Sequence, residues 1–228
     1  MAGLEELHQQ LLPTKIYHQK KTGTNGNEDI NCRLCGKVPE SMAHVLAGCG
    51  ALAQTQYLSR HNAALKIVFF ELLKDFDLIE SNPPWFSPIQ PKPHYENNKA
   101  IAYWDIQVFA EETEVRANRI DARVEDKENK EILLIEMTCP WIENREKKEE
   151  EKTRKYAALR WEIKQRNPGY KVKQINIVMD VLGGYSKDVG RRMTDLFGKI
   201  RAKNILRRMQ KTVLSSSLNI ARRFKIMC

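Results

Sequence analysis

Apolar residues recur along this chain at two kinds of spacing, which separate predicted helices from predicted strands. Spacings of three and four residues place apolar side chains on one side of a helix. They predict helices within residues 4–12, 65–76, 143–166 and 186–200. Alternating or short continuous apolar runs predict strands at residues 100–109, 120–124, 132–137 and 172–182. The C-terminal order is therefore three strands, a helix, a strand and a helix.

Two polar segments interrupt this pattern. Residues 14–29 are polar and contain Gly23 and Gly26, which predicts a flexible connector. Residues 82–98 contain five prolines, which predict a linker without regular structure between two modules. The predicted organisation is a helix and connector at 1–29, a cysteine-containing module with a long helix at 30–80, a linker at 81–98, an α/β domain at 99–212 and a basic tail at 213–228.

The connection lengths predict the fold class of the larger domain. The strands at 120–124 and 132–137 are joined by a short charged turn, which is typical of a hairpin. The helix at 143–166 is long enough to cross over the sheet before the next strand. We therefore expect an α/β fold with a mixed sheet and flanking helices, preceded by a small helical module.

Composition excludes a membrane protein. The chain has 228 residues, of which 42% are hydrophobic and 29% charged, as in soluble globular proteins. No apolar run approaches the length of a spanning helix, and the N-terminus lacks a secretory pattern. The five cysteines, three of them clustered, favour metal binding in a reducing compartment over a disulfide framework.

The clustered cysteines form a candidate zinc site. Cys32, Cys35, His44 and Cys49 are separated by two, eight and four residues, a spacing that suits four tetrahedral ligands. The alternative is a set of buried free cysteines beside a core histidine. His61 is a rival ligand, but His44 already completes the set, so we expect His61 to face nucleic acid or to lie within a helix.

Positive charge is concentrated at the C-terminal end. From Ser186 onward the chain has twelve Lys and Arg against two Asp, a net charge of +10, whereas the whole chain carries +9. Such an excess favours DNA binding, with RNA as a second partner, and agrees with a nuclear location, although a solvated helix face is the alternative. The candidate phosphate-binding residues are Arg119, Arg191, Arg192, Arg201, Lys203, Arg207, Arg208, Arg222 and Arg223.

The hairpin places two acids where they could share a metal ion. Asp121 begins one strand and Glu136 ends the other, so both are expected at the same end of the sheet. Two carboxylates with a nearby lysine suit metal-assisted hydrolysis of a phosphodiester. The alternative pairs Glu136 with a neighbouring arginine. Asp105 is a potential third acid, but we expect it to bond a neighbouring strand or Arg116.

A resemblance extends this interpretation. Arg119-Ile120-Asp121, Glu136 and the pair Lys155-Tyr156 together resemble the restriction-like endonuclease of non-LTR retrotransposons, a branch of the PD-(D/E)xK superfamily in which the lysine lies on the helix after the strand. Thr138 stands where a strand lysine would be, whereas Ile120 departs from the usual proline. The resemblance implies a zinc knuckle before the nuclease, Mg(II) at Asp121 and Glu136, and a reverse transcriptase supplied by a longer element.

Two lysines are candidates for catalysis. Tyr156, Leu159 and Ile163 form the apolar side of the predicted helix, and Lys152 falls on the same side while Lys155 lies at its flank. We therefore expect Lys152 to face the acids. Lys155 matches the Lys-Tyr pair of the family and is the second candidate.

Two functions follow from these residues. The first is a metal-dependent DNA endonuclease that nicks a strand, derived from the C-terminal part of a retrotransposon polyprotein. The second is a nucleic-acid-binding protein with a zinc knuckle and no nuclease activity, as a truncated or domesticated element would be. The acids and lysines alone distinguish the two.

Overall fold

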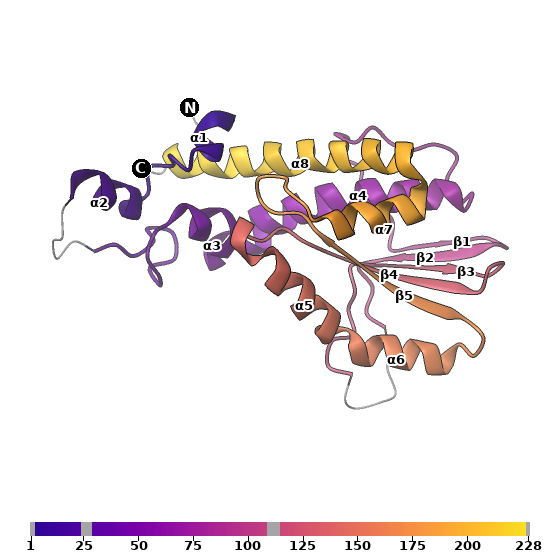
Figure 1. The fold of residues 1–228 in the computed structure, drawn as a ribbon. Coiled ribbons are helices and arrows are strands. Elements are labelled where there is room, and N and C mark those ends of the chain that lie inside the picture. The colour runs from indigo at the N-terminus through magenta and orange to yellow at the C-terminus, as the bar shows by residue number, and fades with distance from the viewer. Residues whose placement is uncertain (1–2, 24–28, 109–114, 227–228) are drawn as a thin grey trace.

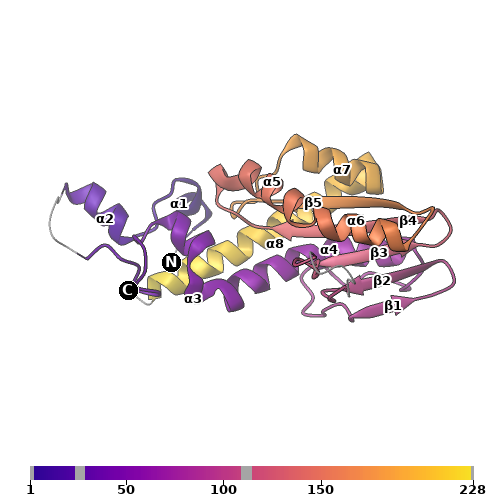
Figure 2. The same ribbon diagram turned by 90° about the horizontal axis from the view of Figure 1, so that it is seen from below.

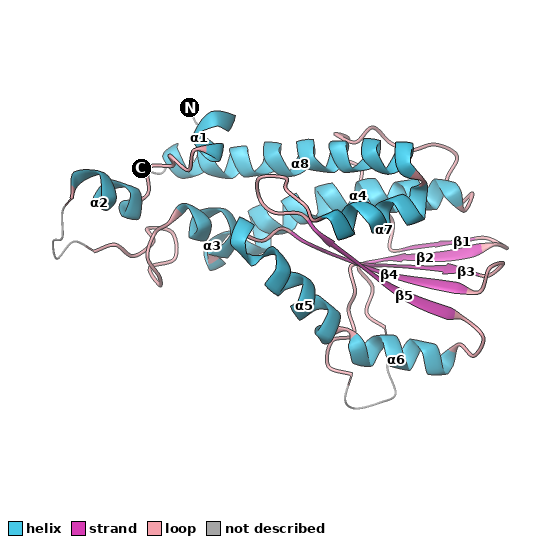
Figure 3. Cartoon of the chain, viewed as in Figure 1, coloured by secondary structure: helices cyan, strands magenta, loops and turns pink. Residues whose placement is uncertain are grey.

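A computed structural model describes residues 3–23, 29–108 and 115–226. One five-stranded sheet organises the C-terminal part in the order β1-β2-β3-β4-β5 (Figure 3). The strands are β1 His94–Glu96, β2 Ala100–Trp104, β3 Ala122–Asp126, β4 Glu131–Thr138 and β5 Lys171–Val178. The first four strands pair antiparallel, and β5 pairs parallel with β4. The predicted mixed α/β sheet is therefore confirmed.

Helices cover both faces of this sheet (Figure 1). On one face lie α4 Leu58–Asp75, α7 Lys187–Phe197 and α8 Lys199–Ile226. On the other lie α5 Arg145–Lys155 and α6 Ala157–Arg166, which form the crossover between the parallel strands. No helix among the described residues is long and apolar enough to cross a membrane.

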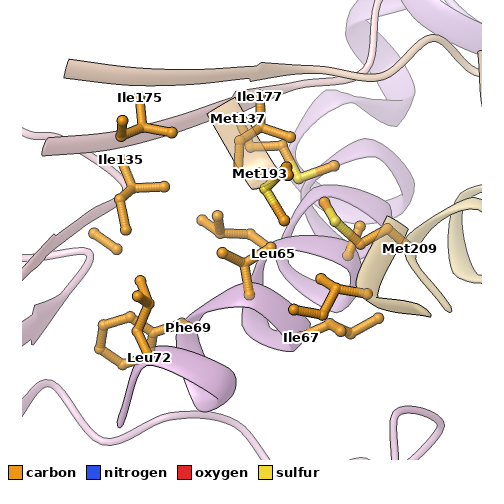
Figure 4. Packing of buried hydrophobic residues seen from close by; sticks show 14 of the residues in the cluster. Leu65, Ile67, Phe69, Leu72, Ile135, Met137, Ile175, Ile177, Met193 and Met209 are labelled. Atoms are coloured by element: carbon orange, nitrogen blue, oxygen red, sulfur yellow. The ribbon is translucent and has the colours of Figure 1, made fainter. Parts of the chain in front are cut away.

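Successive side chains of strand β4 point to opposite faces of the sheet and so belong to two different hydrophobic cores. Its odd-numbered residues, Leu133, Ile135 and Met137, pack in the core beneath α4, α7 and α8. Figure 4 shows Leu65 and Phe69 of α4 reaching toward this face of the sheet. Its even-numbered residues Ile132 and Leu134 pack instead with Tyr156, Leu159 and Ile163 of the crossover helices. Residue 136 consequently faces the crossover.

Helix α4 is buried on more than one side, in contrast to the single buried face that its pattern predicted. Every residue from 64 to 73 is buried, because α4 lies between the sheet and α8. Two of these residues are charged. Lys66 donates to the carbonyls of Ser87 and Ile89, and Glu71 accepts from two arginines of α8. The helix assigned to the N-terminal module thus belongs to the core of the sheet.

A further core gathers the N-terminal region around the end of α8. It contains Leu7 and Leu12, Val45 and Leu46, and Phe224 of α8. The short helices of this region are α1 Leu4–His8, α2 Lys15–Thr22, η1 His44–Gly48, α3 Gly50–Leu52 and η2 Ala53–Tyr57. In Figure 2 these elements lie at one end of the molecule, beside the C-terminus and away from the strands.

Several predicted boundaries need correction. Within 14–29, predicted as connector, the chain forms α2, since Thr14 caps the N–H of Tyr17. The proline-rich segment contains strand β1 at the edge of the sheet. Prolines near an edge strand are tolerated, because one side of such a strand has no neighbouring strand to which its backbone N–H groups must donate. Strand β2 ends at Trp104 because Asp105 has a positive φ of 52°, and residue 109 of the predicted strand lies outside the described residues.

Two predicted helices also differ from the structure. The crossover helix is broken at Tyr156, whose φ of −100° and ψ of 10° separate α5 from α6. The helix after Gly184 begins as predicted with Ser186 capping Val189, but it ends at Gly198. Ile200, predicted to be buried there, is 82% exposed at the start of α8.

Candidate functional site

Cys32, Cys35, His44 and Cys49 lie close enough to hold one metal ion. One ligand atom from each residue lies within 4.8 Å of the other three. The sulfurs of Cys32 and Cys49 are 3.9 Å apart, near the ~3.8 Å that two Zn–S bonds of about 2.3 Å at a tetrahedral angle require. Cys35 Sγ is 3.3 Å from His44 Nε2. This donor set, three soft thiolates and an imidazole, fits structural zinc.

Local turns and a buried acid shape this cluster. Gly36 has a φ of 67° in the turn after Cys35, a conformation that glycine adopts without strain. The fully buried Glu40 accepts the backbone N–H and guanidinium of Arg33 and the backbone N–H of Lys15. Glu40 therefore ties the cysteine turn to α2.

The cluster makes contact with the next helix through Tyr57. The Tyr57 hydroxyl accepts the backbone N–H of Cys49 at 3.0 Å and donates to the carbonyl of Val45 at 2.7 Å. Burial raises the pKa of Tyr57, so this hydroxyl keeps its proton. Burial also raises the pKa of the Cys49 thiol to about 12.

Asp121 and Glu136 meet at one end of the sheet. The backbone N–H of Asp121 lies 3.4 Å from Glu136 Oε2, and the backbone N–H of Met137 donates to Asp121 Oδ2 at 2.7 Å. This follows from the hairpin register, in which Ala122 pairs with Ile135 and the next position brings the two acids together. Neither acid is paired with a neighbouring arginine, so that alternative is wrong for Glu136.

Each acid has its own cationic partner, supplied from opposite sides of the sheet. Lys152 of α5 forms an ion pair with Glu136 Oε1, as the helical periodicity predicted. His61 of α4 lies with Nε2 2.9 Å from Asp121 Oδ2 and 3.1 Å from the carbonyl of Met137. The end of β4 is thus the place where the two helical layers converge on the acids.

Lys155 has a different environment from Lys152. Its Nζ donates to the hydroxyl of Tyr156 at 2.8 Å and lies 4.6 Å from the centre of that ring. Tyr156 in turn donates to the carbonyl of Arg119 at 3.0 Å. The Lys-Tyr pair therefore connects the crossover to the start of the hairpin and lies beside the acids, where the Tyr156 hydroxyl also interacts with Glu136.

The electrostatics of the acid site are unequal. Burial raises the pKa of Glu136, the charge of Asp121 adds to this, and Lys152 opposes both. Burial acts in the same direction on Asp121, but the hydrogen bond and charge of His61 outweigh it and lower the pKa of Asp121. His61 itself resists protonation through burial, yet Asp121 raises the pKa of His61 to about 9. The site therefore holds an ionised Asp121 beside a protonated histidine.

These residues line a cavity of about 340 Å³. Its wall combines the ends of η1 and η2, the start of α4 and the end of β4. The lining residues with polar or charged side chains are Gln54, Tyr57, Arg60, His61, Asp121, Glu136, Thr138, Cys139 and Lys152. The cavity thus connects the tyrosine of the cysteine cluster to both acids.

Several predicted site residues lie elsewhere. Asp105 is bonded to the guanidinium of Arg119 at 2.7 Å and not to Arg116, and Arg119 remains 64% exposed at its side chain. Neither residue reaches the acid cavity. Asp105, the potential third acid, is therefore not part of the site, in agreement with the structural role expected for it, although its partner is Arg119.

The basic residues near the C-terminus fall into two groups. Arg201 and Arg208 pair with the buried Glu71, Arg192 with Glu149, and Arg191 with Asp188. Other basic side chains of α8 are exposed. Lys199, Lys203, Arg207 and Lys211 follow one another four residues apart on its outer side, Arg223 lies nearer the C-terminus, and Arg222 is partly buried.

The chain has no match among models of known protein families or among curated proteins. The site is therefore interpreted from its own geometry. Sequence reasoning found the cysteine cluster, both acids and Lys152. It missed His61 and Arg60 as parts of the acid cavity, although their position at the start of the long helix, directly before its buried segment, was a usable signal.

Proposed function

We propose that this protein is a metal-dependent endonuclease that cleaves one strand of DNA. The observation that carries this proposal is the meeting of Asp121 and Glu136 in one cavity, with Lys152 on Glu136. Acids from neighbouring strands, with a lysine at the same place, are the groups that metal-assisted phosphodiester hydrolysis requires.

The donor set of the cavity fits magnesium. Asp121 and Glu136 offer only carboxylate oxygens, the hard ligands that Mg(II) prefers. When bound, the ion would supply charge neutralisation at the phosphate and activation of water. Lys152 would be displaced from one Glu136 oxygen toward the reacting phosphate, where its ammonium can stabilise charge or transfer a proton. His61 would hold the orientation of Asp121.

The outer side of α8 supports DNA as the partner. Lys199, Lys203, Arg207 and Lys211 span about 18 Å along the helix axis at 1.5 Å per residue. Within the described part of the chain, none of the four pairs with an acid. Such a row of free cations suits successive phosphates of a nucleic-acid backbone, and its contribution to binding must fall with salt. A nuclear location would agree with this substrate.

The resemblance to retrotransposon endonucleases gives the proposal an origin. The order of cysteine cluster, acid hairpin and lysine helix is that of the C-terminal part of such a polyprotein. In that setting the nick would expose a primer, and a reverse transcriptase from a longer element would use it.

A second candidate function is nucleic-acid binding without cleavage. The charge pairs favour it, because both acids already have a cation, His61 on Asp121 and Lys152 on Glu136. Metal binding must therefore compete with two ion pairs. The cysteine cluster and the α8 row would serve this function equally well.

Plasmid nicking tests the proposal. Supercoiled plasmid incubated with Mg(II) should be nicked by the wild type and left intact by Asp121→Ala and Glu136→Ala. Lys152→Ala should nick at least about a hundredfold more slowly, the low end of what one positioned acid-base group contributes. Glu131→Ala is the matched control, because Glu131 lies at the opposite end of β4 and pairs with Lys173.

The outcomes separate the candidates. Nicking that persists in both acid variants would refute the proposed site. Binding of DNA without nicking in any buffer would favour the second function. Loss of nicking in Lys155→Ala, with Lys152→Ala still active, would reverse the roles of the two lysines.

A further inference from the structure

Arg60 is a buried arginine without a carboxylate partner. It is 1% exposed, yet no acid lies within ion-pair distance of it among the described residues. One terminal nitrogen donates to Ser217 Oγ at 3.1 Å, the other lies 3.5 Å from the carbonyl of Cys139, and Nε has no hydrogen-bond partner. The guanidinium carbon lies 5.1 Å from the centre of the Tyr57 ring.

Several other buried charges in this protein are compensated by a charge of opposite sign, although the buried Lys66 donates to backbone carbonyls. Glu40 is paired with Arg33, Glu71 with two arginines, and Glu136 with Lys152. An arginine side chain stays charged in proteins, so it cannot avoid the cost of burial by becoming neutral. A buried guanidinium with neutral partners and an unsatisfied Nε is therefore strongly unfavourable unless an anion comes to it.

The position of Arg60 shows where that anion would lie. Arg60 lines the same cavity as Asp121, Glu136 and Lys152. His61 and Lys152 are each held by an acid of the site. Arg60 is thus the cation of this cavity whose charge remains available.

We propose that Arg60 is the residue that binds a phosphate group in this cavity. The assignment of that group to a nucleic-acid strand rests on the proposed function. A guanidinium presents several N–H donors in one plane and matches two phosphate oxygens at once, which an ammonium cannot do. The ring of Tyr57 lies against the guanidinium. Asp121 and Glu136 then lie at the same phosphate.

A purely structural role is the competing explanation. Through Ser217, Arg60 connects α4 to α8, and its removal could destabilise both helices. A structural arginine would change stability without changing phosphate affinity. The two roles therefore separate when binding and stability are measured on the same variants.

Inorganic phosphate is the probe for the first experiment. Binding is measured by calorimetry without added divalent metal, at constant ionic strength maintained with chloride. Wild type should bind phosphate, and Arg60→Met should bind at least about tenfold more weakly, since a hydrogen bond between charged groups is worth that much. Arg60→Lys should recover only part of the affinity. Arg201→Met, which removes an acid-paired arginine, and Ser217→Ala, which removes the helix contact, should bind as wild type does.

A measurement on the wild type covers the case in which Arg60→Met does not fold. In protein labelled with 15N-arginine, phosphate should shift the Nε–Hε signal of Arg60, assigned from its absence in Arg60→Lys. An unshifted signal, or a folded Arg60→Met with unchanged affinity, would overturn the proposal. A protein that binds phosphate through Arg60 but never nicks DNA would refute the endonuclease and leave the phosphate site standing.

Discussion

Glu71 is a carboxylate in the middle of a buried apolar helix, and two arginines from α8 hold it there. Arg208 lies 2.5 Å and Arg201 2.9 Å from its oxygens. Burial acts to raise the pKa of Glu71, but the hydrogen bonds and charges of Arg208 and Arg201 outweigh it and lower the pKa below its ordinary value. The ionised Glu71 therefore contributes its full stabilisation above the pKa that Glu71 has in the unfolded protein. This contribution is lost as the pH falls through the lower pKa of Glu71 in the folded protein.

We expect Glu71→Gln to reduce the free energy of unfolding at pH 7 by on the order of 1–3 kcal/mol, because a charged hydrogen-bonding partner is removed from a buried site. The difference in free energy of unfolding between this variant and the wild type should shrink as the pH falls below about 4, because Glu71 of the wild type then becomes protonated and neutral as well. Urea unfolding at both pH values measures this. Glu150→Gln, which removes an exposed pair with Arg154, should change stability by less than about 0.5 kcal/mol. A deficit independent of pH would contradict the assigned role of the charge.

Residues close in sequence were the predictable part of the site. The hairpin register placed Asp121 beside Glu136, and the helix period placed Lys152 on the side of Glu136. His61 meets Asp121 across 60 residues, and Arg201 meets Glu71 across 130. These contacts depend on how α4 packs on the sheet and on α8, which no local pattern specifies. A row of basic residues therefore looked uniform in sequence, although folding pairs some with acids and leaves others free.

At the scale of elements, Tyr57 is the link between the cysteine cluster and the acid cavity. Its hydroxyl bonds the backbone of Cys49 and Val45, while its ring lies against Arg60. Removal of a zinc ion from the cluster would leave Cys49 at a site where burial raises the pKa of its thiol, so η1 and η2 should loosen. The disturbance should reach the start of α4 through Tyr57.

We expect one zinc ion per chain by native mass spectrometry, and none in Cys35→Ser. Hydrogen exchange after chelation should rise in peptides covering 30–58 and should change little in β4 and β5, which lie in another core. Tyr57→Phe should keep the zinc but increase exchange at the start of α4. Equal hydrogen exchange in the metal-bound and chelated protein would show that metal binding does not stabilise the fold of this region.

The elements themselves were predictable where the hydrophobic period was long. Strands β2 to β5, the α7 cap at Ser186 and the stop after Arg166 agree with local signals. Local sequence signals did not predict the features that depend on tertiary contacts. The break at Tyr156 bends the crossover so that its buried ring and hydroxyl reach the hairpin, and the three-residue strand β1 exists only because β2 offers an edge.

For the whole molecule, α8 determines how the parts hold together. Its first half packs on α4 and α7 in the core of the sheet, through Ile205, Met209 and Val213. Its second half carries Ile220 and Phe224 into the core that surrounds the cysteine cluster. Residues 213–226 of the segment predicted as a basic tail therefore belong to a structural helix, of which only the polar side is exposed.

DNA affinity should depend on the outer row of α8 and not on total charge. Exchanging Lys203, Arg207 and Lys211 for Gln should weaken duplex binding and flatten its dependence on salt by about three charges. The matched control exchanges Arg154, Lys173 and Arg191, which are held by acids outside the core, for Gln and removes the same charge. Fluorescence anisotropy over a salt series measures both. Equal losses in the two triple variants would show that binding follows net charge alone.

Deletion of residues 214–228 tests the structural role of α8 directly. The deletion removes Ile220, Ala221 and Phe224, which are at most 2% exposed, and exposes Leu7, Val45 and Leu46 of the opposing elements. Losing several buried side chains at once costs more than about 5 kcal/mol, since each large one contributes about 2 or more. The truncated protein should therefore lose protection from hydrogen exchange throughout 3–23 and 29–58, and its zinc cluster should become labile, while β2 to β5 keep their protection. Arg223→Gln, which removes exposed charge from the same segment, should leave the protection and the zinc cluster unchanged.

If the deletion weakens DNA binding while the N-terminal region stays protected, the segment acts through its charge. The core that it forms with the N-terminal region is then dispensable.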